Sequence, residues 1–369
     1  MKRFLFIICL VFLGIIGISA QKEQTPIHRL ILQGDSCMNE HDSFHAITYY
    51  QQYINEHPHN LNVLRKLASC YRLRGDNKKC IACMDSIPND SLNHEDLRMM
   101  FYSHLNLGDK KKVELYGMTI YGKYPYDGEV FATLLQQWNN HGEPERVSAF
   151  ALSYVEKRDS TNILINKELA YSLYLQLRYE QAIPRYKKLI ADGFDNFESN
   201  FVIGLCYYNL EKYREAYTYL NKAAEMKKDN PNMNSLFYLG MTCKKLSEQT
   251  KNIVEKENLA RHAIINLERS ITVAYPRSRG LYVNQQLAEL YYYKLEYENA
   301  GHAFAQCIEY DDEDDPHNYY NAAQMYIGAK MKPQAKLYLQ MFLAKADKLK
   351  DEKEKTKLTA KVKEQLKGM

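Results

Sequence analysis

The sequence lacks the short motifs that mark the commonest catalytic and nucleotide-binding sites. It contains no HExxH, no GxxxxGKS/T, no GxGxxG and no GxSxG pattern. It therefore offers no zinc-protease helix, phosphate loop, dinucleotide loop or nucleophile turn of the usual kinds. Catalytic groups can still converge from distant positions, so these absences alone do not exclude an enzyme.

The chain also lacks a strong charge of either sign. It carries 49 Lys and Arg residues against 45 Asp and Glu residues, a formal net charge of +4. The lysine-rich C-terminal tail supplies this excess, and the rest of the chain is near neutral. We therefore expect no broad basic surface for nucleic acid.

Long hydrophobic runs are missing except at the start. Lys2 and Arg3 precede an apolar run over 4–18, and the small residues Ser19 and Ala20 follow it. This pattern predicts a signal peptide over 1–20 and an exported chain, periplasmic or secreted and soluble after cleavage. The alternative is an uncleaved membrane anchor, although the run is slightly short for a span.

Cysteine is present, but not in a pattern that predicts disulfides. Seven of the eight cysteines follow the apolar run, and an odd number cannot pair completely within one chain. We interpret them as buried thiols that replace alanine. Cys80 and Cys83 form a CxxC pair, which leaves a redox role as the alternative. No βαβ pattern surrounds that pair.

What the sequence does contain is an internal repeat, clearest over 200–224. Gly204 and Ala216 are small residues placed so that two short helices can approach closely, while Tyr207 and Leu220 fill the space beside them. The close-packing position of the first helix recurs at steps of 33 to 36 residues, with one step of 48: Gly34, Ala68, Phe101, Leu135, Ala170, Gly204, Gly240, Ala288 and Ala323. The partner position of the second helix recurs in parallel: Ala46, Cys80, Val113, Val147, Ala182, Ala216, Ala263, Ala300 and Ala335.

These spacings resemble the tetratricopeptide repeat (TPR), a helix-turn-helix unit of about 34 residues. The resemblance covers nearly all of 27–343 and implies an all-α fold, a right-handed α-solenoid of about nine TPR-like repeats over 21–343. Gly75, Gly108 and Gly142 fall in the turns between paired helices, where a left-handed residue ends a helix. Asp76 and Asp109 are expected to cap the helices that follow.

Three regions depart from the regular repeat. Phe101 and Leu135 put bulk where a small residue is usual, so the third and fourth repeats are expected to be irregular. Residues 247–258 are an insertion that would extend both helices of the seventh repeat into a projecting hairpin, or else be a neutral surface insertion. The lysine-rich segment 344–369 is expected to be a capping helix, with a basic helix on an anionic membrane as the alternative.

In TPR proteins the first helices line a concave groove that holds peptides or partner helices. Carried over position by position, the resemblance gives these groove candidates: Tyr171, Tyr174, Phe201, Tyr208, Asn209, Phe237, Met241, Lys244, Lys245, Tyr282, Gln285, Glu289, Tyr292, Tyr293, Tyr320 and Gln324. Tyr207, Tyr291 and Tyr326 are assigned to the core instead. Arg65 and Arg98 are basic groove residues, but no carboxylate clamp is assigned because the asparagines that such a clamp needs are missing.

No metal or cofactor is predicted. His41 and His45 are four residues apart, and His57 and His59 flank Pro58, but neither pair has a third ligand at motif spacing. The acidic run over 309–315 is expected to favour the start of the next helix. A loose calcium site is the alternative, although the run lacks the glycine and ligand alternation of an EF-hand.

The sequence as a whole predicts a non-catalytic scaffold or adaptor of the bacterial cell envelope that binds a protein or peptide in its groove. A repeat array from end to end leaves no room for a separate catalytic domain. Two alternatives stay open: a solenoid that binds carbohydrate or another small ligand, and an accessory subunit of an envelope enzyme or secretion complex. No nucleic-acid partner and no stable membrane span after signal cleavage are expected.

Overall fold

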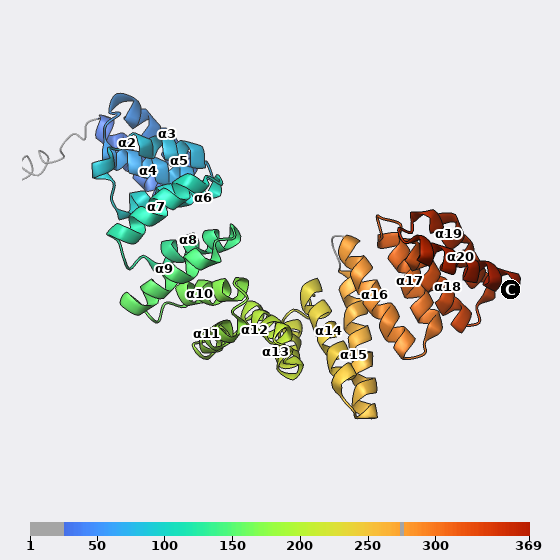
Figure 1. Ribbon diagram of the computed structural model, residues 1–369. Coiled ribbons are helices and arrows are strands. Elements are labelled where there is room, and N and C mark those ends of the chain that lie inside the picture. The colour runs from blue at the N-terminus through green and yellow to red at the C-terminus, as the bar shows by residue number, and fades with distance from the viewer. Residues whose placement is uncertain (1–25, 274–276) are drawn as a thin grey trace, which may run out of the picture. The chain divides into compact units, whose positions relative to one another are not determined.

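The computed structural model describes residues 26–273 and 277–369, so the predicted signal peptide lies outside the described residues. The described chain is all-α, without a strand, and helices α2 to α19 follow one another as nine consecutive pairs before the last helix, α20 (Figure 1). Consecutive helices pack side by side, as α2 does with α3 and α12 with α13. The fold is therefore an all-α helical-repeat solenoid.

The chain divides into two compact units. Unit 1 comprises the residues up to Glu143 together with Phe150–Ile165, and unit 2 comprises Pro144–Ala149 with Asn166–Met369. The helices that begin in unit 1 are α2 (Pro26–Asn39), α3 (Ser43–Glu56), α4 (Leu61–Leu73), α5 (Asn77–Asp85), α6 (His94–Asn106), α7 (Lys110–Lys123), α8 (Gly128–Asn140) and α10 (Ile163–Leu175), with a 3-10 turn η1 (Asn89–Ser91).

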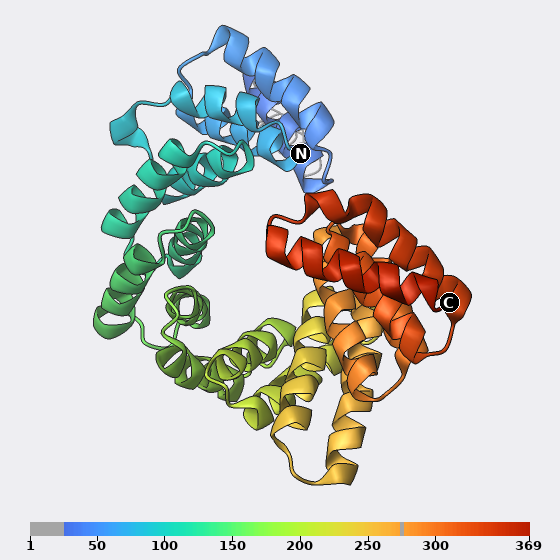
Figure 2. The same ribbon diagram turned by 45° about the vertical axis from the view of Figure 1, so that its right-hand side comes forward.

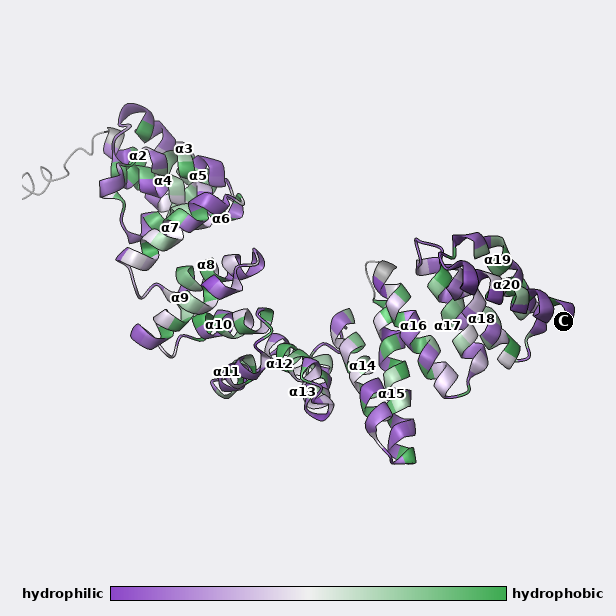
Figure 3. Cartoon of the chain, in the orientation of Figure 1, coloured by the Kyte–Doolittle hydropathy of each residue, from purple (hydrophilic) through white to green (hydrophobic). Residues whose placement is uncertain are grey.

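The remaining helices begin in unit 2. They are α9 (Pro144–Lys157), α11 (Tyr179–Ala191), α12 (Phe197–Asn209), α13 (Tyr213–Met226), α14 (Met233–Gln249), α15 (Ile253–Thr272), α16 (Arg277–Tyr293), α17 (Tyr297–Tyr310), α18 (Pro316–Gly328), α19 (Lys332–Lys345) and α20 (Glu352–Lys367), with a 3-10 turn η2 (Ala346–Lys348). Hydrophobic and hydrophilic residues are mixed along every helix (Figure 3), as helices with one buried face require.

The two residue series that set the repeat occupy the core. The first-helix series, from Gly34 to Ala323, is buried at every position. The second-helix series, from Ala46 to Ala335, is also buried at every position, and none of its members is more than 4% exposed. The predicted register of the repeats is thus confirmed. Asp76 and Asp109 cap α5 and α7 as expected, since their side chains accept hydrogen bonds from the backbone of Lys79 and Lys112.

The third pair shows how a bulky residue fits at the close-packing position. Phe101 is completely buried, and a Cβ atom on Gly117 of the facing helix α7 would lie 3.1 Å from its ring. In the sixth pair the sizes are reversed, because a Cβ on Gly204 would lie 2.6 Å from Leu220 of α13. Large and small residues have exchanged helices, so α6 and α7 stay packed together.

Every short turn between paired helices except the α14–α15 turn contains a residue in the left-handed backbone region. In unit 1 this residue is mostly glycine: Gly75, Gly108 and Gly142 have φ of 76°, 71° and 78°. In unit 2 the same place is taken by residues with side chains, at φ between 58° and 61°: Leu177, Glu211, Leu295 and Lys330. A Cβ atom makes this conformation costly, so unit 2 forms the same turn at higher backbone energy.

The seventh pair is longer than the others. Helix α14 has 17 residues and α15 has 20, whereas the two helices of the preceding pair have 13 and 14. Of the insertion, residues 247–249 end α14, 250–252 form the turn and 253–258 begin α15. This hairpin end extends past the neighbouring helices in both views (Figures 1 and 2). Ile253 and Val254 at its tip are 82% and 70% exposed.

Helix α20 covers the last repeat of unit 2. Val362 is completely buried in a cluster with Tyr319, Leu339 and Phe342, and Leu358 and Leu366 pack against the same cluster. The apolar stripe of α20 is therefore used in internal packing. Among the residues that the structure describes, no helix is both long and apolar enough to span a membrane.

Candidate binding groove

Six aromatic residues form a connected ladder over the first helices α12, α14 and α16 of unit 2. We define this aromatic ladder as Phe197, Phe201, Tyr208, Phe237, Tyr238 and Tyr282. Tyr238 is its centre, since its ring centroid lies 6.4 Å from Phe201, 5.4 Å from Tyr208 and 5.2 Å from Phe237. Phe237 reaches on to Tyr282 of α16 at 5.7 Å. These distances are typical of favourable ring pairs.

Helical periodicity explains why these rings meet. Phe197 and Phe201 are four residues apart and stack at 5.5 Å, and Tyr208 follows Phe201 by seven residues, on the same face. Asn196 fixes the start of α12, because its side chain accepts a hydrogen bond from the backbone of Ser199. Burial raises the pKa of Tyr208 to about 12, so this hydroxyl stays protonated and neutral at physiological pH.

An aromatic cavity of about 340 Å³ opens between α14 and α16 at one end of the ladder. Phe237, Tyr238 and Tyr282 supply its rings, and Met233 and Val283 add further apolar surface. Arg279 also lines this cavity, and its Nη1 donates a hydrogen bond to Asn234 Oδ1 at 2.5 Å. The aromatic cavity thus combines apolar walls with one oriented guanidinium group.

A second space, the lysine cavity, lies further along the same two helices. It has a volume of about 290 Å³ and is lined by Lys244 and Glu248 of α14, Lys256 of α15, and Glu289 and Tyr293 of α16, among others. Lys244 Nζ donates hydrogen bonds to Glu289 at 2.5 Å and Gln286 at 2.7 Å. Lys256 Nζ lies 4.7 Å from the centroid of the Tyr293 ring, a favourable cation–π geometry.

The structure brings many of the predicted groove residues together in this region, but not all. Phe201, Tyr208, Phe237 and Tyr282 join the ladder, and Lys244, Glu289 and Tyr293 line the lysine cavity. Six candidates lie outside both: Tyr171, Tyr174, Asn209, Lys245, Gln285 and Tyr292. Tyr171 and Tyr174 stack on each other at 5.9 Å, and Tyr292 meets Tyr297 at 6.0 Å. Asn209 donates to the Leu205 carbonyl, Lys245 pairs with Glu248 at 3.4 Å, and Gln285 is half-buried.

Met241 corrects the sequence prediction. The residue is only 5% exposed, so it packs in the core, although it lies on the same face of α14 as Phe237 and Lys244. Tyr320 and Gln324 are engaged by the C-terminal helix: Lys361 Nζ donates to the Tyr320 hydroxyl at 2.7 Å, and Gln324 pairs with Gln365 at 3.1 Å. Helix α20 therefore contacts the candidate residues of α18.

Sequence reasoning missed several residues that shape the site, among them Phe197 and Tyr238 of the ladder, and Arg279 and Lys256 of the two cavities. Tyr238 directly follows the selected Phe237, and neighbouring positions on a helix are only 100° apart, so both rings reach the ladder. The adjacent aromatic pair was a signal that could have found it. Lys256 comes from the second helix α15, and only the lengthened hairpin brings it to α16.

The basic residues selected in unit 1 serve a different purpose. Arg65 Nε donates to Asp96 at 2.9 Å, and Arg98 Nη1 donates to Asp127 at 2.6 Å. Both carboxylates are 2% exposed. Although burial alone would raise the pKa of Asp127, hydrogen bonds from Arg98, from the Val130 backbone and from His94 hold it below its usual value. These arginines join one repeat of unit 1 to the next.

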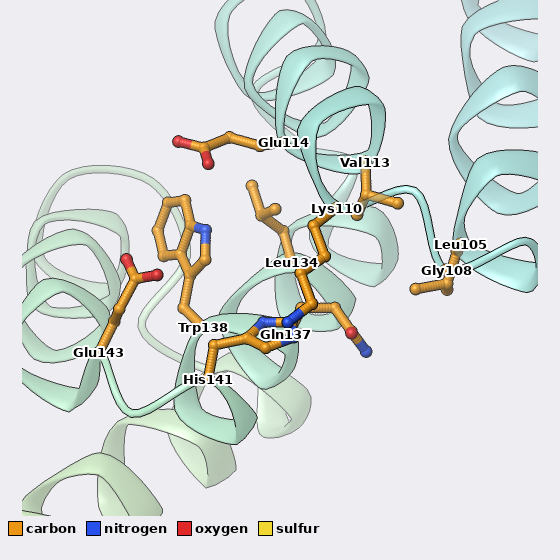
Figure 4. Close-up of a pocket in the computed structure, with 10 residues that line it drawn as sticks. All are labelled: Leu105, Gly108, Lys110, Val113, Glu114, Leu134, Gln137, Trp138, His141 and Glu143. Atoms are coloured by element: carbon orange, nitrogen blue, oxygen red, sulfur yellow. The ribbon is translucent and has the colours of Figure 1, made fainter.

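A separate cavity of about 250 Å³ lies within unit 1, where the α6–α7 and α8–α9 turns approach each other (Figure 4). Its apolar wall is Val113, Leu134 and the single tryptophan, Trp138. Figure 4 shows the carboxylates of Glu114 and Glu143 near the Trp138 indole. Sequence reasoning gave no signal for this cavity, because its residues come from separate turns and helices.

Cys80 is buried and Cys83 half-buried, and part of the acidic run is paired with lysines. Burial raises the pKa of Cys80 and of Cys83, the latter to about 11, whereas a redox-active pair needs a lowered value. In the acidic run, Asp314 is paired with Lys345 at 2.6 Å and Lys348 at 2.8 Å. No group of three or more potential metal ligands occurs in the described ranges 26–273 and 277–369.

Comparisons with known proteins gave one partial family match and several structural neighbours. The family model described as "Anaphase-promoting complex, cyclosome, subunit 3" matches residues 175–251. A comparison with curated protein sequences found no significant match.

Several solved structures are similar in backbone. A tetratricopeptide repeat protein from Parabacteroides merdae shares 14% identity at a TM-score of 0.47, over 72% of this chain and 98% of that one. YrrB, described as a TPR protein with an unusual peptide-binding site, shares 18% identity at a TM-score of 0.43, over 53% and 92%. The APC/C hetero-tetramer Cut9–Hcn1 shares 16% identity at a TM-score of 0.41, over 93% and 64%.

Proposed function

We propose that this tetratricopeptide-repeat protein binds an extended segment of a partner protein along the aromatic ladder of unit 2. The observation that carries the proposal is a set of rings that is continuous over three neighbouring repeats and still reachable by a partner. Tyr282 is 49% exposed, and Tyr293 beside the lysine cavity is 51% exposed. Tyrosine anchors of this kind contribute much of the energy of protein interfaces.

The proposed role is that of a non-catalytic scaffold. The ring contacts hold the ladder in place before a partner arrives, so binding avoids part of the entropy cost of ordering the site. The tyrosine hydroxyls of the ladder can donate hydrogen bonds to the backbone carbonyls of an extended chain. Both properties favour a peptide without requiring one fixed side-chain sequence along its whole length.

Selection from a displayed library of random 12-residue peptides tests the proposal. We expect the wild-type protein to enrich peptides that a Tyr208→Ala, Tyr282→Ala variant no longer binds. Tyr126→Ala is the matched control, because Tyr126 is 77% exposed and belongs to unit 1. Equal enrichment by the wild type and the double variant, at equal melting temperature, would move the interface away from the ladder.

A carbohydrate is the second candidate ligand, favoured by the same exposed rings, which can stack on sugar faces. Soluble oligosaccharides of neutral composition should then displace selected peptides from the wild type. If peptides bind the wild type but not the double variant, and no oligosaccharide displaces them, the carbohydrate ligand is rejected and the peptide ligand is kept.

We also propose that binding takes place in the bacterial cell envelope, because the sequence over 1–20 has the pattern of a signal peptide. Fractionation of cells that produce the full chain, or a chain without residues 2–20, tests this location. Equal cytoplasmic recovery of both chains would contradict it.

A further inference from the structure

The two groove cavities of unit 2 belong to a part of the repeat array with unusually long first helices. Helices α14 and α16 have 17 residues each, while α10, α12 and α18 have 13. Four additional residues lengthen a helix by about 6 Å at 1.5 Å per residue. The α14–α16 region is therefore long enough to carry both the aromatic cavity and the lysine cavity.

The two cavities lie along one line. On α14 the aromatic cavity is lined by Phe237 and the lysine cavity by Lys244 and Glu248, which follow by 7 and 11 residues and so share a helix face. On α16, Glu289 and Tyr293 follow Tyr282 by the same 7 and 11 residues. Separations of about 10 residues on both helices place the cavity centres about 15 Å apart.

The aromatic cavity suits a large apolar side chain. Its rings and the Met233 side chain provide apolar surface, and its volume of about 340 Å³ exceeds that of one aromatic side chain. Arg279 donates one hydrogen bond, from Nη1 to the Asn234 side chain, and a guanidinium group carries five N–H donors. The remaining donors are available for a carbonyl oxygen of the peptide backbone beside the apolar residue.

The lysine cavity suits an acidic side chain. Its two glutamates are already paired: Glu289 with Lys244 at 2.5 Å and Glu248 with Lys245 at 3.4 Å. Lys256 is held over the Tyr293 ring, which attracts its charge but does not neutralise it. Among the described residues, Lys256 therefore leaves one positive charge in the lysine cavity without a carboxylate partner, which favours the binding of one carboxylate from a ligand.

We propose that the partner segment is an extended peptide with a large apolar residue and an acidic residue separated by four or five positions. An extended chain advances about 3.3 Å per residue, so that spacing bridges about 15 Å. The apolar residue occupies the aromatic cavity and the acidic residue binds at Lys256. The inference rests on the proposed function and assigns a task to the insertion, since Ser247, Glu248 and Lys256 of the lysine cavity all lie within it.

Charge reversal at Lys256 tests the pairing. Random-peptide selections are run with the wild type, with Lys256→Glu and with the control Lys251→Glu, which makes the same charge change at an exposed position of the same insertion outside the cavity. Wild type and control should select the apolar–acidic spacing. Lys256→Glu should keep the apolar residue and select Lys or Arg in place of the acidic one.

Affinity measurements give a second readout. A peptide selected on the wild type should bind Lys256→Ala about tenfold more weakly, as expected for loss of one charge-assisted hydrogen bond. Replacing its acidic residue by the neutral amide should weaken binding to the wild type by the same factor and leave binding to Lys256→Ala unchanged. Melting temperatures of all variants control for folding.

The outcomes separate the two proposals. The selected peptides could depend on the ladder but lack the apolar–acidic pair, or they could keep the acidic residue when selected on Lys256→Glu. Either result would overturn the inference and leave the proposed function standing. Absence of any ladder-dependent peptide would overturn both.

Discussion

The first helices of unit 1 are linked by charge, and those of unit 2 by aromatic rings. In unit 1, Arg65 and Arg98 each bind a carboxylate that is 2% exposed on the repeat that follows. In unit 2, Lys244 of α14 also pairs with Glu289 of α16, but that carboxylate is 58% exposed. Asp195, which pairs with Lys222, is 38% exposed. The continuous connection from α12 to α16 is made by rings.

The difference shows that one repeat design can give the same face two uses. A buried ion pair is fully engaged and costs much to break, so this face of unit 1 contributes to its own stability. The ladder rings are only partly covered by the fold, and Tyr282 keeps 49% of its surface in solvent. The corresponding face of unit 2 therefore has contact area left for a partner.

The largest effect is expected where the charged connection is removed. Asp127→Asn should destabilise unit 1 by about 3 kcal/mol, because Arg98 would lose its buried partner. The matched change Asp195→Asn in unit 2 should cost less than about 1 kcal/mol, since that pair is exposed. Denaturant unfolding followed by hydrogen exchange resolves the two units, and equal losses would erase the contrast between them.

A smaller and opposite effect is expected in the turns. Glu211→Gly should stabilise unit 2 by up to about 1 kcal/mol, because glycine adopts positive φ without a Cβ penalty, although its greater freedom in the unfolded chain offsets part of the gain. Gly108→Ala in unit 1 should destabilise by about 1 kcal/mol. No atom lies within 4 Å of a Cβ built on Gly108, so backbone strain is the only cause. A stability loss in both variants would refute this account.

The smallest effect is expected from two histidines that respond to pH in opposite directions. Burial lowers the pKa of His104 in unit 1. The stability that its neutral form contributes is present above the unfolded value of 6.5 and is lost as pH falls from there through the lowered folded value. Burial alone would also lower the pKa of His317 in unit 2, but hydrogen bonds to Asp315 and Glu354 raise it. The stability that His317 contributes is present at low pH and lost as pH rises through the raised value.

Hydrogen exchange at pH 5.5 and 7.5, corrected for intrinsic rates, measures this response. Acidification should weaken protection around α6 and α7 and strengthen it where α18 meets α20. His104→Gln and His317→Gln should each remove the response of their own unit alone. If both units change in the same direction, these histidines do not control it.

The sequence predicts the repeat register well because two independent series of small residues carry it. Gly204 and Ala216 must lie where helices come closest, whatever surrounds them. The outcome at Phe101 could not be predicted, because it depends on Gly117 of the facing helix, which no repeat pattern singles out. The turns at Leu177 and Glu211 were missed for a related reason. The turn requires a residue with positive φ, and glycine adopts that conformation at the lowest energy but is not the only residue that can.

The groove was predicted less completely than the core. Position in the repeat indicated Phe237 and Tyr282, but it also indicated Met241, which is only 5% exposed on the same face of α14. Which side chains of that face stay accessible depends on how the neighbouring repeats pack over it. Arg279 and Lys256 acquire their place only when α16 and the lengthened α15 are set beside α14, so no pattern within one helix could identify them.

The aromatic ladder has a mechanical consequence. Its rings belong to three successive repeats, and in such arrays each repeat is held mainly by its immediate neighbours. Any bending between α12, α14 and α16 changes the spacing of the rings, so the ring spacing follows the curvature of this part of unit 2. A peptide bound across the ladder would resist such bending and make the array stiffer. Tension along the chain would in turn change the affinity for the peptide.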